Sequence, residues 1–154
     1  MKVVRFMLLA VALIFIVIQF LPDRLPENIP SDEKDIIHSG LVTGEVLPLL
    51  KNSCFDCHSN QTHYPWYSRM APSSWFLADH IKEGREHLNF SEWENLSRRE
   101  KIGILDEINE EITSGAMPLK SYLLIHRNAK LSPAEVSRMT QWTEDATEKM
   151  LEGS

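Results

Sequence analysis

Residues 54–58 read Cys-Phe-Asp-Cys-His, and this short stretch constrains the fold of the chain more than any other feature. It holds the only two cysteines, at the spacing that attaches a c-type haem covalently. Cys54 and Cys57 are about one helical turn apart, so on a helix both thiols lie on one face and can reach two vinyl groups of one haem edge. His58 follows directly and is placed to be the proximal iron ligand. The motif predicts one covalent haem c with a domain folded around it.

Other uses of a closely spaced cysteine pair fit this chain less well. A thioredoxin-like redox pair follows a hydrophobic strand, whereas residues 45–52 (EVLPLLKN) indicate a short helix or turn. A structural zinc site needs four ligands, and beyond the pair the chain offers only scattered histidines such as His63. A disulfide across two intervening residues would constrain little of the unfolded chain. Haem attachment is therefore the favoured interpretation.

The N-terminus predicts a membrane anchor. Lys2 and Arg5 precede an uncharged, apolar run over residues 6–21, close to the length that crosses a hydrocarbon core as a helix. Bulky and charged residues follow at 22–26 in place of a small-residue cleavage site, which favours a retained signal anchor over a cleaved signal peptide. Residues 1–22 are therefore expected to form a single transmembrane helix. Basic residues that flank a membrane helix stay on the cytoplasmic side, so Lys2 and Arg5 predict a cytoplasmic N-terminus and an exported remainder of the chain.

This topology is that of a single-pass protein of a bacterial inner membrane. The remainder of the chain would lie in the periplasm, outside the cytoplasm, where haem attachment to such a motif takes place. Residues 23–39 are expected to form a tether, because residues 21–39 carry three prolines and many charges. Residues 40–154 would form the haem domain. Beyond position 22 the chain has 14 basic and 22 acidic residues, a net charge of −8. Nucleic acid is therefore an unsuitable partner, and an acidic surface suits docking to basic redox proteins, whose identity the sequence does not give.

From residue 40 onward the pattern is helical. Ser73 or Ser74 can cap a helix that runs toward Gly84. Ser97 and Glu100 form a capping box before an apolar stripe that Gly115 ends. Ser132, Pro133 and Glu135 open a last helix whose stripe includes Met139 and Met150. The pattern predicts an all-α domain of four or five helices, like a class I cytochrome c, around one haem.

The second axial position of the iron decides between electron transfer and ligand chemistry. Met117 is the favoured distal ligand, because it follows the helix stop at Gly115 and precedes a proline that biases it to an extended conformation. It also lies between His58 and the last helix, in the chain order of small class I cytochromes. Met70 and His126 are alternatives in loop-like segments, whereas Met139 and Met150 are expected in the core. Tyr67, Trp75 and Arg85 are candidate haem-pocket residues, with Arg85 suited to pair with a propionate.

Several multi-residue motifs together resemble a known family. They are Cys-Phe-Asp-Cys-His-Ser-Asn-Gln-Thr at 54–62, Pro-Trp-Tyr at 65–67, Ala-Pro-Ser-Ser-Trp at 71–75, Gly-Arg at 84–85, Leu-Asn-Phe-Ser-Glu-Trp at 88–93, Met-Pro at 117–118 and Leu-Ser at 131–132. Over residues 40–145 the chain resembles the bacterial haem-binding domain family of small, often membrane-anchored, c-type monohaem proteins. The resemblance implies haem c on Cys54, Cys57 and His58, with Met117 as distal ligand.

The expected function is that of a membrane-tethered periplasmic monohaem cytochrome c that carries single electrons. The alternative is a haem-based sensor or ligand-binding module, in which the sixth position is open or weakly filled. An enzyme such as a peroxidase is not expected, because no distal acid and base pair is evident.

Overall fold

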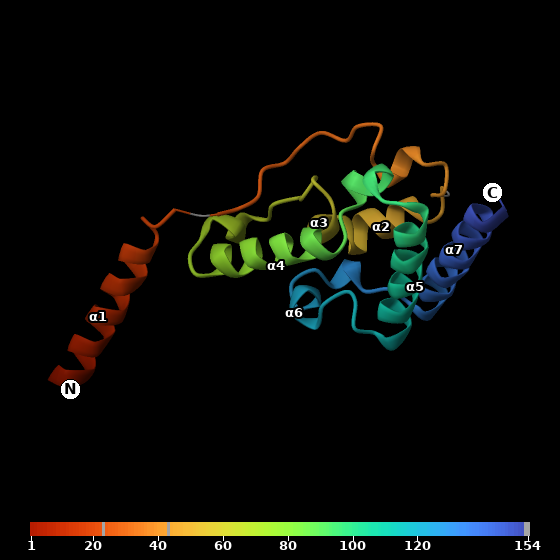
Figure 1. The fold of residues 1–154 in the computed structure, drawn as a ribbon. Coiled ribbons are helices and arrows are strands. Elements are labelled where there is room, and N and C mark those ends of the chain that lie inside the picture. Colours follow the sequence, from red (N-terminus) through yellow and green to blue (C-terminus); the bar gives the residue numbers. More distant parts are fainter. Residues whose placement is uncertain (23, 43, 153–154) are drawn as a thin grey trace.

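The computed structural model describes residues 1–22, 24–42 and 44–152, and within these ranges the chain is helical and contains no strand. The predicted all-α class is therefore confirmed. Figure 1 shows an isolated N-terminal helix, an extended connection and a compact helical body. The helices are α1 (Lys2–Ile18), α2 (Leu47–Ser53), α3 (Phe55–His58), α4 (Ser73–His87), α5 (Arg98–Ser114), α6 (Lys120–Leu123) and α7 (Pro133–Glu152). Short 3₁₀ turns lie at η1 (Ile36–His38), η2 (Trp66–Arg69), η3 (Phe90–Asn95) and η4 (Arg127–Ala129).

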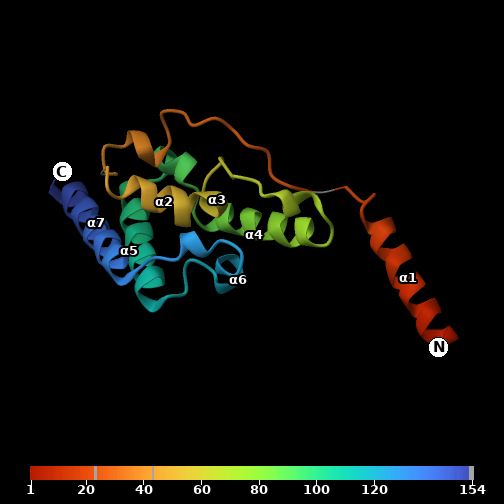
Figure 2. The same ribbon diagram turned by 180° about the vertical axis from the view of Figure 1, so that it is seen from behind.

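The core lies where α5 and α7 pack side by side against α2 and η3 (Figures 1 and 2). Trp93, Leu105 and Met139 are fully buried there, and Trp142 is nearly so. Met139 is therefore a core residue, as predicted, and Met150 packs against the same cluster. The core supports one side of the body and leaves the ends of α3, α4 and α5 free to form a site.

The helix starts written in the sequence are largely confirmed. The Ser97 hydroxyl accepts the Glu100 N–H, and the Glu100 carboxylate accepts the Ser97 N–H, which completes the capping box of α5. Gly115 ends α5 in the left-handed conformation with φ 71°, as a C-cap glycine should. Ser132 and Glu135 make the same reciprocal bonds at the start of α7. These caps fix where α5 and α7 begin and where the Met117 loop leaves α5.

Helix α4 differs from its prediction at both ends. The Ser73 hydroxyl donates to the carbonyls of Tyr67 and Met70, so it does not cap the helix. The helix also continues past Gly84 to His87. Gly84 is therefore not a helix stop, because a glycine inside a helix is tolerated when packing favours it.

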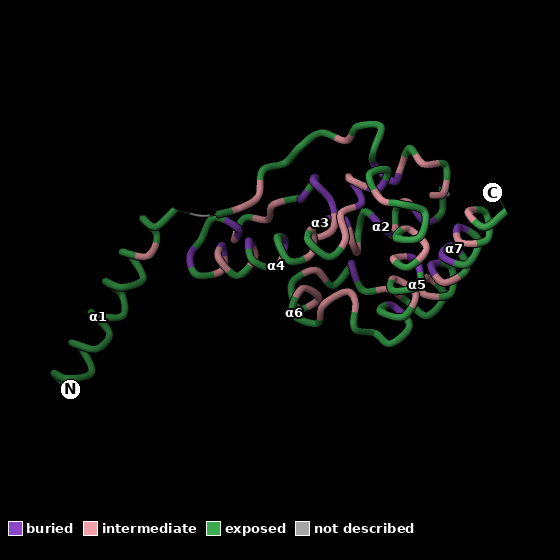
Figure 3. Tube along the Cα trace, in the orientation of Figure 1, coloured by how far each residue is buried: buried purple, intermediate pink, exposed green. Residues whose placement is uncertain are grey.

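Helix α1 projects from the body. It has 17 residues, none of them buried (Figure 3), and nearly all of its side chains are apolar. Among the described residues, no helix combines the length and apolar character needed to cross a membrane. The structure therefore does not support the predicted transmembrane helix.

The predicted tether is not a free linker. Its first residue, Asp23, lies outside the described residues, as do the last two of the predicted haem domain, 153 and 154. The Asn28 side chain exchanges two hydrogen bonds with the backbone of Thr62, at 2.8 and 2.9 Å, and the Ile29 N–H donates to Asn60. Ile36 is fully buried in the core. The packed body therefore begins before residue 40, because polar side chains and one isoleucine hold this segment against it.

Candidate cofactor site

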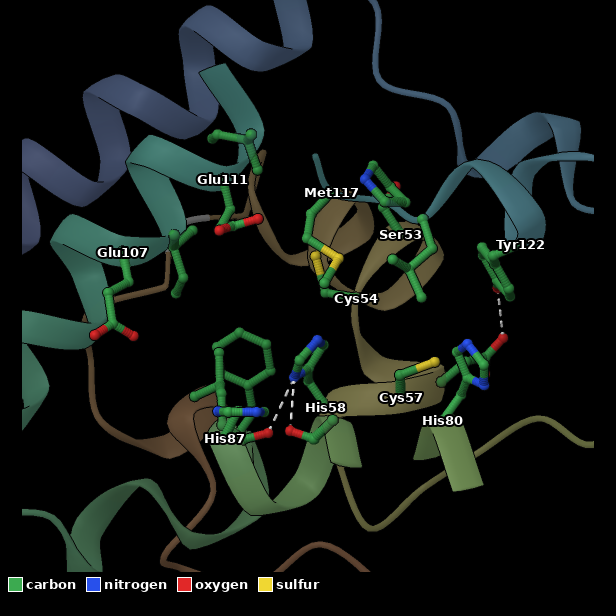
Figure 4. Close-up of a pocket in the computed structure, with 18 of the residues that line it drawn as sticks. Ser53, Cys54, Cys57, His58, His80, His87, Glu107, Glu111, Met117 and Tyr122 are labelled. Atoms are coloured by element: carbon green, nitrogen blue, oxygen red, sulfur yellow. Dashed lines mark hydrogen bonds between the residues drawn. The ribbon is translucent and has the colours of Figure 1, made fainter. Parts of the chain in front are cut away.

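A large cavity opens between α3, α4, the end of α5 and the loop that follows α5 (Figure 4). Its volume is about 520 Å³, which is in the range of small-molecule and cofactor pockets. The cysteine-histidine motif lines one side and Met117 lines the other, with apolar side chains such as Phe90, Ile104 and Leu131 between them. The structure thus brings the four residues predicted to hold a haem into one cavity.

His58 is held in one orientation by its backbone neighbours. Its Nδ1–H donates to the carbonyl oxygens of Gly84 at 3.0 Å and Leu88 at 3.1 Å, both near the end of α4. Two acceptors at Nδ1 require the proton to be on that nitrogen, so Nε2 carries the lone pair. Burial lowers the pKa of His58 below its usual value, which keeps the ring neutral. The ring is therefore prepared as a metal ligand through Nε2, with its tautomer fixed by a backbone acceptor.

Gly84 makes this arrangement possible by letting α4 approach the motif. A Cβ at this position would lie 2.8 Å from the carbonyl oxygen of Cys57 and 3.2 Å from its Cβ. A backbone oxygen cannot rotate away as a side chain can, so only glycine fits without a shift. The helix was expected to run only toward Gly84, so the role of this glycine beside Cys57 was not predicted, although the glycine itself was the available signal.

The two thiols lie along one edge of the cavity and form no disulfide. Burial, with a smaller contribution from Cys57, raises the pKa of Cys54 to about 12. Burial and the nearby Asp56 raise the pKa of Cys57 to about 11. Both groups are protonated at neutral pH, unlike the low-pKa thiolate of a disulfide oxidoreductase. The environment is that of an apolar wall and does not activate the thiols for redox exchange.

Met117 projects into the cavity from the side opposite His58 (Figure 4). The loop that carries it is fixed to the end of α5, where the backbone N–H groups of Ala116 and Met117 both donate to the Glu111 carbonyl, at 3.0 and 3.1 Å. The left-handed Gly115 makes this reversal possible. The position agrees with the predicted distal ligand, whose bond to iron stays a prediction.

A hydrogen bond links the two sides of the cavity. The Tyr122 hydroxyl, on α6, donates to the Asp56 carboxylate, on α3, at 2.8 Å. Burial, followed by this bond to Asp56, raises the pKa of Tyr122 well above its usual value, so it remains a donor. The His126 ring stacks on Tyr122 with centroids 4.1 Å apart, and the Tyr67 hydroxyl lies 3.4 Å from His126 Nε2. No motif in the sequence pointed to Tyr122.

The three predicted pocket residues are not among those that line the cavity. Tyr67 stands one layer behind it, beyond His126. Arg85 points toward the N-terminal connection, where its guanidinium donates to the Glu27 carbonyl and the Thr62 hydroxyl. Trp75 is half-buried in the first turns of α4. Tyr67 and Trp75 were expected at the site because their rings follow the motif closely in sequence, and Arg85 because a guanidinium can pair with a propionate. The structure places all three outside the cavity lining.

One comparison with known proteins supports the binding of a haem. A family model for the haem-binding domain matches residues 13–145, which is well over half of the chain, so the chain belongs to this haem-binding domain family. No curated protein and no solved structure matches it.

Three features of the cavity fit a haem. They are its volume, its apolar walls, and a neutral histidine whose Nε2 is unprotonated. Its thiols and Met117 are candidate additional attachments.

Proposed function

We propose that this protein is a membrane-associated cytochrome c that carries single electrons outside the cytoplasm, with one haem attached to Cys54 and Cys57. The observation that carries the proposal is the fixed His58 ring, in a cavity shared with both thiols and Met117. A bound haem supplies a one-electron couple at its iron. His58 would hold the iron from one side and Met117 from the other, and this ligand pair suits electron transfer at a relatively high potential.

The surroundings of the site also suit a carrier. Gly84, Leu88 and Asp56 hold the histidine side of the cavity through backbone and side-chain hydrogen bonds, so little reorganisation is expected on electron exchange. Phe90, Ile104 and Leu131 give the cavity apolar walls, which would limit the access of water to a bound haem. We propose no enzymatic turnover for this site.

The mouth of the cavity favours a cationic redox partner. Glu83 on α4 and a group of glutamates on α5 line the cavity and are exposed; the α5 residues are Glu107, Glu110 and Glu111. Acidic side chains around a redox site steer positively charged partners toward it and repel acidic ones. The proposed partners are therefore proteins with a basic docking surface.

The apolar α1 helix supports association with a membrane. A helix that is apolar on all sides and exposed along its length is not stable in water, so a non-aqueous phase or another apolar surface must cover it. We propose that α1 and the apolar residues after it hold the protein at the bacterial inner membrane, with the haem domain on the periplasmic side.

The proposal is tested by making the chain together with a haem-attachment system and measuring the pyridine haemochrome spectrum of the denatured protein. We expect one covalent haem, and its complete loss in the variant C54S/C57S. The control Ser53→Ala lies next to the motif and should retain the haem. A chain without covalent haem would contradict the proposal, and rapid binding of carbon monoxide to the native reduced protein would favour the ligand-binding alternative.

A further inference from the structure

The N-terminal helix is clamped to one end of the helical body. The Gln19 side chain, just after α1, donates to the Ala71 carbonyl and accepts the Ala71 N–H, both at 3.0 Å. Because the amide exchanges two hydrogen bonds with one backbone residue, it fixes both the position and the direction of the end of the helix relative to Ala71. Figures 1 and 2 show α1 leading away from the body, so its C-terminal end is the end nearest the body.

The connection beyond the clamp leaves little freedom. The Tyr64 hydroxyl donates to the Pro26 carbonyl, and Asn28 pairs with Thr62. The chain is therefore attached to the body at Gln19 and again at Pro26, with only a few residues between the two attachments. A membrane that covers α1 would lie close to the η2 end of the body, and the domain would not be lifted away from it.

Exposed apolar side chains gather at this same end. Trp66 is 80% exposed, Phe76 is 61% exposed and Met70 is 41% exposed, and all three are within a few residues of Ala71. Phe20 and Leu21, at the end of the clamped helix, are exposed as well. Large apolar residues exposed together mark an interaction surface.

The composition of this surface fits a lipid interface. Tryptophan is enriched where headgroups meet acyl chains, because its ring is apolar and its N–H is polar. Arg69, exposed between Trp66 and Met70, can place its apolar stem along lipid and its charged group among phosphates. A surface of this kind, continuous with an apolar helix, is suited to lipid.

We infer that Trp66, Met70 and Phe76, called here the lipid face, rest on the surface of the membrane that holds α1. The inference depends on the proposed membrane association and adds an orientation to it. The lipid face also reaches the haem cavity, because the Phe76 ring lies 4.3 Å from that of His80, which lines the cavity. The rise from Ser73 to His80 along α4 is about 10 Å, so the cavity would lie close to the bilayer at a fixed height.

Brominated phospholipids, which quench tryptophan emission on contact, test the lipid face in the full chain. The chain would be placed in phosphatidylcholine–phosphatidylglycerol vesicles with and without brominated acyl chains. We expect bromine-dependent quenching in the wild type and the loss of most of it in Trp66→Phe, because Trp93 and Trp142 are buried and Trp75 is only partly exposed. The variant M70S/F76S should show severalfold less quenching. The control L124S/I125S removes another exposed apolar pair and should behave as the wild type.

The readout does not require haem, so it is independent of the cofactor. Equal quenching in the wild type and in Trp66→Phe would overturn the inference. The absence of quenching in a chain that floats with the vesicles would also overturn it, and would leave a second copy or another protein as the occupant. A chain that does not float would overturn the membrane association and the lipid face together, whereas missing covalent haem would overturn only the proposed electron carrier.

Discussion

The two walls of the cavity are held in different ways. The attachment wall, residues 53–58, is held by side-chain bonds and close packing, since His58 donates to two carbonyls of α4 and Gly84 touches Cys57. The Met117 wall, residues 111–119, is held through its backbone, which bonds to the Glu111 carbonyl at the end of α5. In the attachment wall the His58 side chain is itself held by hydrogen bonds. In the Met117 wall only the backbone of the loop is held, and the loop positions the Met117 side chain. Changes in the two walls should therefore have different consequences.

The largest expected difference is between the two axial ligands. His58→Ala should abolish the native c-type spectrum, because the attachment wall offers no second imidazole in that position. Met117→Ala should keep the covalent haem but lose the weak far-red band of a methionine–iron bond. Its reduction potential should fall by a sizeable part of the roughly 0.8 V range that axial ligands span. Absorption spectra and redox titration of the purified proteins measure both effects.

Met70→Ala is the matched control for the Met117 substitution, since Met70 is also in a loop but lies outside the cavity. It should leave the spectrum and the potential unchanged. If Met70→Ala removes the far-red band and Met117→Ala does not, the assignment of the distal ligand is wrong.

The next largest effect should come from Gly84, which tests how tightly the attachment wall is packed. In Gly84→Ala the new Cβ would meet the Cys57 carbonyl at 2.8 Å, so α4 must move away from the motif. We expect a loss of about 1–3 kcal/mol in the free energy of unfolding, as for overpacked cores. Haem incorporation should also fall, because the carbonyls of Gly84 and Leu88 orient His58. Urea unfolding and haem content are the measurements.

Gly103→Ala provides the opposite case. Gly103 is inside α5, and a Cβ there would meet nothing within 4 Å. The substitution should stabilise the protein by about 0.5–1 kcal/mol through helix propensity alone. If both substitutions stabilise the protein, the contact between α4 and the motif is looser than the structure indicates.

A smaller effect should follow from cutting the hydrogen bond between Tyr122 on α6 and Asp56 in the attachment wall. Tyr122→Phe removes the donor to Asp56 and keeps the ring that stacks on His126. Because the pair is half-buried, we expect a loss of about 1.5 kcal/mol in the free energy of unfolding, at the lower end for bonds to charged groups. Thermal unfolding of Tyr122→Phe, Asp56→Asn and the double variant gives the coupling between them.

Tyr67→Phe is the control for the tyrosine change, because the Tyr67 hydroxyl makes only a long contact, at 3.4 Å, with His126. Its effect on stability should be smaller than that of Tyr122→Phe. Additive effects of Tyr122→Phe and Asp56→Asn would show that the bond does not couple α6 to the attachment wall.

The features that the sequence predicted well are those written within a few residues. The motif at 54–58, the capping box at Ser97 and the glycine cap at Gly115 all depend on neighbours in the chain. The place of Met117 in the cavity belongs to this group too, because a helix stop and the following proline limit where its side chain can point. Its role as an iron ligand stays a prediction. Local rules of capping and spacing were sufficient for these features.

The features that the sequence did not predict depend on partners far along the chain. The role of Gly84 depends on Cys57, 27 positions away, and that of Tyr122 depends on Asp56, 66 positions away. Asn28 is an ordinary polar residue in a proline-rich segment that was expected to be a tether. Its hydrogen bonds to the backbone of Thr62 hold this segment against the body. No local pattern specifies such pairs, so nearness in sequence was a poor guide for Tyr67, Trp75 and Arg85.

The smallest expected effect concerns α5, on which the Met117 wall depends. The Ser97 hydrogen bonds lower the pKa of the exposed Glu100 carboxylate below its usual value. A lowered folded-state pKa means that the carboxylate stabilises the fold above the unfolded-state pKa, and that this contribution is lost as pH falls through the folded value. Glu100→Gln should therefore lower the melting temperature slightly at neutral pH, with the difference from wild type shrinking in acid. The control Glu148→Gln, an exposed carboxylate in α7, should show less of this pH dependence. A difference that grows in acid would have the wrong sign for a capping carboxylate. It would also show that the Glu100 cap at the start of α5 does not contribute to the stability of the Met117 wall.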